Sequence, residues 1–220
     1  MDLLTNRLLS LILFSPLAAA AVVMLLPGKS TKAIRWTALV ASLVPLGLSI
    51  ILWIGYSSSD GGFQFEETAV WYDAINSSYH LGVDGISILL LLMTTLLTSI
   101  SILCSYNAIE ERQKEYYVSL LILETGMLGV FVSLDLFLFY IFWEIMLVPM
   151  YFLIGIWGGP RKLYAAIKFF LYTLVGSVLL LLGFLALYFL NANPEYGSGE
   201  LTFNLLELYK MAPKLSPDHQ

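Results

Sequence analysis

The chain has 220 residues, of which 59% are hydrophobic and only 12% are charged, and its mean hydropathy is +0.81. An average soluble domain has about 45–50% apolar residues, so this composition excludes a soluble enzyme or binding module and makes the lipid bilayer the main solvent. The formal net charge is −5 and no run of basic residues occurs, so we expect no nucleic acid as a partner.

Six apolar stretches are each long enough to cross a membrane, which takes roughly 20 residues for about 30 Å of hydrocarbon. Pro-Gly, Gly-Gly-Pro and charged runs separate the stretches. The sequence therefore predicts an all-α membrane protein with about six transmembrane helices within residues 1–190. The predicted spans are 8–26, 34–54, 85–105, 117–134, 136–157 and 164–190.

The first stretch could also be a cleaved signal peptide, because Arg7 precedes an apolar run that contains four alanines at 18–21. The run continues to Leu26, which is the length of a span. We therefore expect a helix that is retained in the mature protein.

Two segments are predicted to lie outside the hydrocarbon core. Residues 63–80 combine Trp71 and Tyr72 with acidic residues, a mixture typical of the membrane–water interface, so we expect surface-lying structure there. Residues 191–220 are polar and should form an extramembrane tail, with one short amphipathic turn at 205–209.

Lysines and arginines occur in alternate loops. The loops after the first, third and fifth spans carry them, whereas the loop after the second span and the link at Asp135 carry acidic residues and no Lys or Arg. Positively charged loops near helix ends tend to stay in the cytoplasm. Both termini are therefore expected outside, in the periplasm or its organellar equivalent.

Glu144 is the strongest candidate for chemistry, because it lies near the middle of the fifth span with no other charge within one turn. An ionisable side chain at this depth costs about 2.5 to 3.5 kcal/mol, so it needs a partner, water or a function. Pro149 leaves the carbonyl of Ile145 without its helical donor, and such a site can hold water. Burial favours the neutral carboxyl and a nearby lysine favours the carboxylate, so a moving lysine would switch its proton affinity. A structural carboxyl bonded to a neighbouring helix is the alternative.

Glu124 and Lys168 are weaker proton-relay candidates. Glu124 lies about two turns inside the fourth span, either buried or close enough to the interface to be hydrated. Lys168 lies near the start of the sixth span, where its long stem could instead extend to the cytoplasmic surface as an anchor.

Three further ionisable residues have structural explanations. Asp84 and Asp135 each precede an apolar run, where a carboxylate caps a helix and complements its dipole. His80 lies near the outer interface and is expected to be a packed histidine rather than a proton entry point.

Motifs for bound cofactors are missing from the sequence. It has no Gly-rich phosphate loop and no Cys or His cluster with metal spacing, and its single cysteine, Cys104, can form no internal disulfide. We expect neither a metal ion nor a redox cofactor in this chain.

The segment DLFLFYIFWEIMLVPMYFLI at 135–154, followed by GIWGG at 155–159, resembles a signature of the M-type (subunit 4) antiporter-like chain of proton-pumping NADH:quinone oxidoreductase, respiratory complex I. HLGVDGIS at 80–87 and KLYAAIKFFLYT at 162–173 extend the resemblance. It covers essentially the whole chain.

The resemblance implies the first part of an antiporter-like membrane-arm subunit of about fourteen helices, built from inverted repeats. It implies that quinone reduction drives proton transfer through Glu144, the position that matches the family's key glutamate. NADH, flavin, iron–sulfur centres and quinone are then bound by partner subunits, in a bacterial inner (plasma) membrane or an organellar inner or thylakoid membrane. Other membrane-arm subunits and the lipid bilayer are the expected partners.

In the family, the charge partner of this glutamate is a lysine on a broken seventh helix. The 220 residues stop before that helix. We therefore expect a fragment of a longer subunit, or a chain that does not pump alone.

Two other functions fit the same residues. A subunit of a multisubunit cation/proton antiporter or a membrane-bound hydrogenase uses the same glutamate, although Trp143 and the context of Pro149 favour the respiratory chain. A truncated scaffold that only fills the membrane arm would not transport protons.

Overall fold

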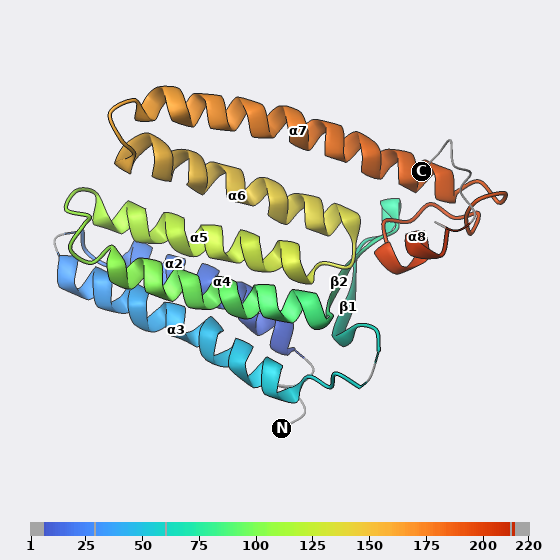
Figure 1. Ribbon diagram of the computed structural model, residues 1–220, viewed down its shortest axis with the longest axis horizontal. Coiled ribbons are helices and arrows are strands. Elements are labelled where there is room, and N and C mark those ends of the chain that lie inside the picture. Colours follow the sequence, from blue (N-terminus) through green and yellow to red (C-terminus); the bar gives the residue numbers. More distant parts are fainter. Residues whose placement is uncertain (1–6, 29, 60, 212, 214–220) are drawn as a thin grey trace.

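The computed structural model describes residues 7–28, 30–59, 61–211 and 213, and six of the described helices are long and apolar enough to cross a membrane. They lie side by side along one direction (Figure 1), as the prediction of six spans requires. The six helices are α2 (Leu8–Leu25), α3 (Thr31–Gly55), α4 (Gly85–Cys104), α5 (Gln113–Val132), α6 (Leu136–Trp157) and α7 (Lys162–Asn191).

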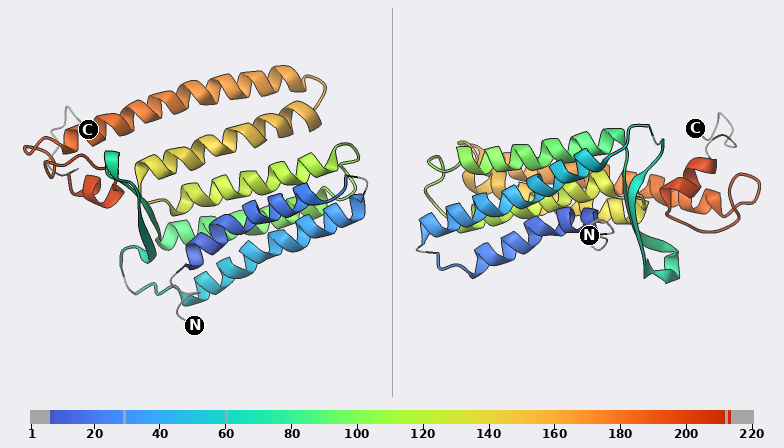
Figure 2. Two further views of the ribbon diagram at one scale, coloured as in Figure 1. Left: turned by 180° about the vertical axis from the view of Figure 1, so that it is seen from behind. Right: turned by 90° about the horizontal axis from the view of Figure 1, so that it is seen from below.

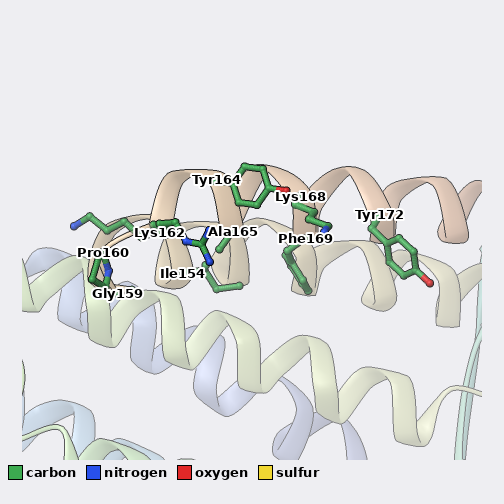
Figure 3. Close-up of a pocket in the computed structure, with 11 residues that line it drawn as sticks. Ile154, Gly159, Pro160, Lys162, Tyr164, Ala165, Lys168, Phe169 and Tyr172 are labelled. Carbon is green, nitrogen blue, oxygen red and sulfur yellow. The ribbon is translucent and has the colours of Figure 1, made fainter.

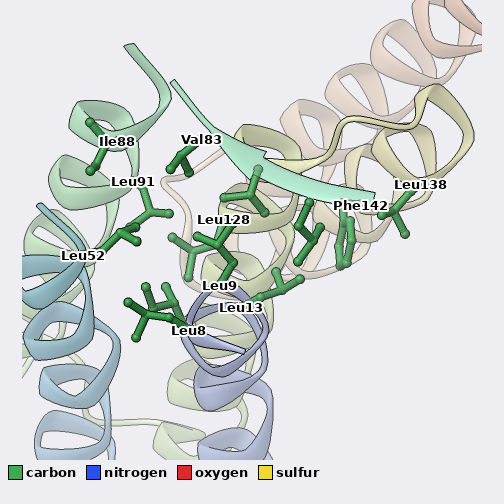
Figure 4. Close-up of a cluster of buried hydrophobic side chains, with 13 residues drawn as sticks. Leu8, Leu9, Leu13, Leu52, Val83, Ile88, Leu91, Leu128, Leu138 and Phe142 are labelled. Atoms are coloured by element: carbon green, nitrogen blue, oxygen red, sulfur yellow. The ribbon is translucent and has the colours of Figure 1, made fainter. Parts of the chain in front are cut away.

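The helices form two regions. Helices α2, α3, α4 and α5 pack into a four-helix unit, whereas α6 packs on α5 and α7 packs on α6 as an extension to one side (Figures 1 and 2). Figure 4 shows Leu9, Leu91 and Leu128 converging beneath a strand at one end of the unit. A second cluster around Ala20, Ala38 and Leu121 fills the other end. The apolar core therefore belongs mainly to α2–α5.

Aspartate caps begin α4 and α6, as predicted. Asp84 accepts hydrogen bonds from the backbone N–H groups of Ile86 and Ser87, and Asp135 accepts from those of Phe137 and Leu138. These contacts satisfy amides that have no partner within a helix.

Two glycines allow α5 and α6 to pack closely. A Cβ atom at Gly126 would collide with Met146, and one at Gly129 would collide with the ring of Phe142. Phe142 and Met146 therefore define the side of α6 that faces α5.

The interfacial segment forms a β-hairpin, which is the exception to the predicted all-α structure. Strand β1 (Gln64–Tyr72) pairs antiparallel with β2 (Ser77–Val83), and the short 3-10 helix η1 (Asp73–Ile75) connects them. The hairpin crosses one end of the bundle (Figure 1).

The hairpin also caps α2. The Glu67 carboxylate accepts hydrogen bonds from the backbone N–H groups of Leu9 at 2.7 Å and Ser10 at 3.2 Å. A strand thus satisfies amides at the first turn of the first helix, which fixes the hairpin against the bundle.

The segment after α7 folds back onto the start of α6. The Leu136 amide donates to the carbonyl of Phe203 at 2.9 Å, and the Phe203 ring stacks on Tyr188 with centroids 4.3 Å apart. The seven-residue helix α8 (Leu205–Met211) lies where a short amphipathic turn was expected. The boundary at residue 191 between membrane region and tail stays a prediction.

The loops that carry lysine and arginine gather at one end of the bundle. The three loops that carry Lys and Arg lie at one end of the bundle, and the hairpin, the α5–α6 link and α8 lie at the other (Figure 1). This is the predicted alternation. Which end faces the cytoplasm stays a prediction.

Candidate functional site

Glu144 lies at the contact between α6 and α7. It is half-buried, and Oγ of Ser177, on α7, donates a hydrogen bond to Oε1 of Glu144. The same Ser177 hydroxyl lies 3.3 Å from the hydroxyl of Tyr140, and the serine is only 2% exposed. Tyr140 and Glu144 are four residues apart, so they share one face of α6. The three side chains form a polar cluster inside an apolar helix pair.

The periodicity of α6 explains why Glu144 points to α7. Phe142 and Met146 contact α5, and Glu144 lies two residues from each, about 200° around the helix axis. The side of α6 that carries Glu144 is therefore turned away from α5.

Sequence reasoning missed Ser177. A serine in an apolar helix carries no charge and bonds easily to its own backbone, so it gives no strong signal. The available signal was its position: it is the polar residue near the middle of α7, at a depth comparable to that of Glu144 in α6.

Lys168 lies apart from Glu144. It is nine residues before Ser177 on α7, which is about half a turn around the axis and about 14 Å along it. Figure 3 shows Tyr164, Lys168 and Tyr172 following one another along α7. Lys168 is exposed and lines a cavity of about 680 Å³. Its Nζ lies 5.9 Å from the centre of the ring of Tyr164, a residue that is one turn closer to the basic loops. This position favours the anchor interpretation.

Glu124 is enclosed in the four-helix unit. It is 0% exposed, and neither carboxylate oxygen has a hydrogen-bond partner among the residues that the structure describes. It lies two residues from Gly126, which faces α6, so its side chain points to the opposite side of α5. Of the two positions expected for Glu124, the structure shows the buried one. Glu124 and Glu144 therefore occupy different environments. Glu124 lies on the side of α5 that faces away from α6, and Glu144 lies on the side of α6 that faces away from α5.

His80 is a packed histidine, as expected. It is 4% exposed, and its Nε2 lies 3.0 Å from a carboxylate oxygen of Glu66 on the neighbouring strand. Among the described residues, no group of three or more His, Cys, Asp or Glu side chains is placed to hold a metal ion.

Comparison with known proteins gives the same picture as the predicted resemblance. The transmembrane family described as NADH:quinone oxidoreductase/Mrp antiporter matches residues 133–216. The chain is 46% identical to NADH-quinone oxidoreductase subunit M of Rhodobacter capsulatus over 187 residues, and 43% identical to NADH-ubiquinone oxidoreductase chain 4 of Chondrus crispus over 176 residues. These alignments cover 83% and 80% of this chain. The chain spans 36% of the length of each of these two relatives.

Solved structures show the same fold. A chain of respiratory complex I from Thermus thermophilus with bound NADH superposes with a TM-score of 0.77 at 26% identity, over 92% of this chain and 39% of that one. A chain of the Mrp complex from Dietzia has a TM-score of 0.68 at 18% identity, over 88% of this chain and 20% of that one, which shows the fold alone. The chain is an integral membrane protein with an antiporter-like fold.

Proposed function

We propose that this relative of the M-type antiporter-like chains of NADH:quinone oxidoreductase is part of a membrane-arm subunit in which Glu144 transfers protons. Quinone reduction elsewhere in the complex would drive the transfer. NADH, flavin, iron–sulfur centres and quinone are then bound by partner subunits, and this chain supplies no redox centre. The observation that carries the proposal is a carboxylate within a membrane span that accepts a hydrogen bond from a hydroxyl of the neighbouring helix.

The energetics of Glu144 support a proton carrier. A charged carboxylate in the span costs about 2.5 to 3.5 kcal/mol, and the Ser177 hydrogen bond offsets only part of this. Protonation removes the charge, whereas a cation brought near would stabilise the carboxylate.

Hydroxyls provide a short path away from the carboxyl. Ser177 can both donate and accept, and the Tyr140 hydroxyl lies 3.3 Å further along, one helical turn nearer the hairpin end of α6. We assign Tyr140 and Ser177 the role of holding and passing the proton at Glu144.

The two weaker candidates differ in the proposal. Glu124 would take no part in the transfer at Glu144, because its side chain points away from α6. Lys168 would act on Glu144 only through a helix that covers the open side of α7, since it faces away from Ser177.

The test is Glu144→Gln in the complete respiratory complex, with Glu207→Gln as the control. Glu207 lies on α8 and forms an ion pair with Lys210 at 2.8 Å, and it is not part of the cluster. We expect Glu144→Gln to lower proton pumping per NADH oxidised several-fold while assembly persists, and Glu207→Gln to leave it unchanged. Unchanged pumping in an assembled Glu144→Gln complex contradicts the proposal.

Ser177 can be tested separately from the carboxyl. Ser177→Ala removes the donor to Glu144 and should reduce pumping less than Glu144→Gln, whereas Ser177→Thr keeps a hydroxyl and should retain most of it. The measurement is the pH dependence of pumping, which a purely structural role would not shift.

A cation/proton antiporter subunit is the second candidate, because the matched family also includes Mrp antiporters and the fold resembles a chain of an Mrp complex. This function predicts sodium-dependent proton exchange in vesicles without NADH. Exchange that requires NADH favours the respiratory function.

A further inference from the structure

A long cavity runs between α5 and α6 at the end of the bundle that carries the basic loops. Its volume is about 910 Å³. Its deeper walls are apolar and include Val118 and Ile122 of α5 with Ile145, Val148 and Phe152 of α6. Ile145, Val148 and Phe152 are each more than a third exposed, so the groove is open along one side.

Charged side chains occupy only the mouth of this groove. Arg112 and Lys114 contribute two positive charges, and Glu115 contributes one negative charge with Oε1 3.6 Å from Nε of Arg112. Lys114 directs Nζ to the carbonyl of Leu26 at 2.8 Å, which uses one of its three donors. The three charged side chains that line the groove thus have a net charge of +1, and they keep donors that remain available.

The groove also has the dimensions of one lipid leaflet. From Arg112 to Ile122 the rise along α5 is about 15 Å, half of the roughly 30 Å hydrocarbon core. Trp157 stands at the mouth, with its indole N–H bonded to the carbonyl of Glu111 at 3.0 Å, as is usual for tryptophan at the head-group level. Depth, polarity and aromatic position agree with a single membrane interface.

We propose that this groove binds one anionic phospholipid with a single net negative charge, of the phosphatidylglycerol type. Its phosphodiester lies against Arg112 and Lys114, and an acyl chain lies along Val148 and Phe152. The lipid charge balances the net charge of the lining side chains, whereas a zwitterionic lipid leaves that charge uncompensated. Basic pockets between transmembrane helices are suited to acidic head groups. The inference does not rest on the proton-transfer role proposed for Glu144.

The test uses the whole complex in phosphatidylcholine vesicles that contain a trace of photoreactive phosphatidylglycerol or photoreactive phosphatidylcholine, each with the reactive group on an acyl chain. After illumination, peptides from α5 and α6 are analysed for lipid adducts by mass spectrometry. We expect phosphatidylglycerol to label the groove several-fold more than phosphatidylcholine.

Variants of opposite sign separate binding from misfolding. Arg112→Asn keeps a residue that tolerates the positive φ of +51° at this position, and it should lower labelling by phosphatidylglycerol to the phosphatidylcholine level. Glu115→Gln should raise it, and Val148→Trp should reduce labelling by both lipids. Arg161→Gln is the matched control, because Arg161 lies in a basic loop at the same end but lines a different cavity.

Three results would overturn the proposal. If both lipids label the groove equally and Arg112→Asn does not change the labelling, the groove contacts only bulk annular lipid. Absence of adducts in the groove means that protein covers it. A fall in labelling with Glu115→Gln as well as with Arg112→Asn means that the charges act on folding rather than on the lipid.

Discussion

The α2–α5 unit and the α6–α7 pair each hold a glutamate within the membrane, but in opposite ways. In α5, 56% of an apolar stretch of 18 residues is buried, and Glu124 is enclosed within the unit. In α7 only 6% of the corresponding stretch is buried. Glu144 lies where this exposed helix contacts α6. The difference shows that depth alone does not make a carboxyl a proton carrier. Glu144 combines a hydroxyl partner with a side of the molecule that another helix or water can reach.

Crowding at α5–α6 should give the largest effect. Gly129→Leu would drive a side chain into the Phe142 ring, and overpacking costs about 1–3 kcal/mol or more, so we expect loss of the assembled subunit. A Cβ atom at Gly176 on α7 would meet nothing within 4 Å, so we expect Gly176→Leu to be tolerated. Native gels of the complex measure both, and equal yields would contradict the division into a closed and an open region.

Removing the cap of α6 should come next. Asp135 is 1% exposed and accepts four hydrogen bonds, from Ser77 and Ser78 of β2 and from the first turn of α6. We expect Asp135→Ala to lower the free energy of unfolding by about 2 kcal/mol, near the upper end for a lost cap. Asp84→Ala, at a more exposed cap, should cost about 1 kcal/mol. Thermal unfolding in detergent gives the order, and a smaller effect at Asp135 would count against it.

The sealed carboxyl should be replaceable with a gain in stability. Glu124→Met removes a buried polar group that has no partner among the described residues, so we expect stabilisation by about 1–3 kcal/mol. Glu144→Met should give a smaller gain, because it also removes the partner of the Ser177 hydroxyl. A lower unfolding temperature for Glu124→Met than for the parent would show that the unit depends on this carboxyl.

The smallest effect concerns pH at the cap of α4. The Ser87 amide, with that of Ile86, holds the pKa of Asp84 below its usual range. Because the pKa of Asp84 is lower in the folded than in the unfolded protein, its carboxylate stabilises the fold at pH values above the unfolded-state pKa. This stabilisation is lost below about pH 4, as the pH falls through the folded-state pKa. Asp84→Asn keeps a capping oxygen and should flatten this acid dependence of thermal unfolding. An unchanged acid dependence in the variant would assign it to other carboxylates.

The six helices could be predicted because each apolar run reports directly on the bilayer, and the caps because Asp84 and Asp135 precede such runs. The fourth helix begins earlier than predicted, at Gln113 rather than Tyr117, since polar residues at the interface continue a helix as easily as apolar ones. The hairpin could not be predicted, because its register and its bonds from Glu67 to α2 depend on contacts distant in sequence.

The site was only partly predictable. The cost of a charge in the membrane identified Glu144 and Glu124. It could not show that Glu144 contacts a hydroxyl of the neighbouring helix whereas Glu124 points into the four-helix unit. That distinction depends on Gly126 and Gly129, which fix the side of α5 that meets α6. Ser177 and the orientation of Lys168 became clear only once the contact face of α7 was known.

The central claim is that Glu144, and not Glu124, changes its protonation during turnover. Infrared difference spectra of the complete complex, between resting and NADH-driven states, report the carbonyl stretch of protonated carboxyl groups directly. We predict a band that Glu144→Gln removes and Glu124→Gln leaves in place. A band that survives in Glu144→Gln and disappears in Glu124→Gln would contradict the account and move proton transfer into the four-helix unit.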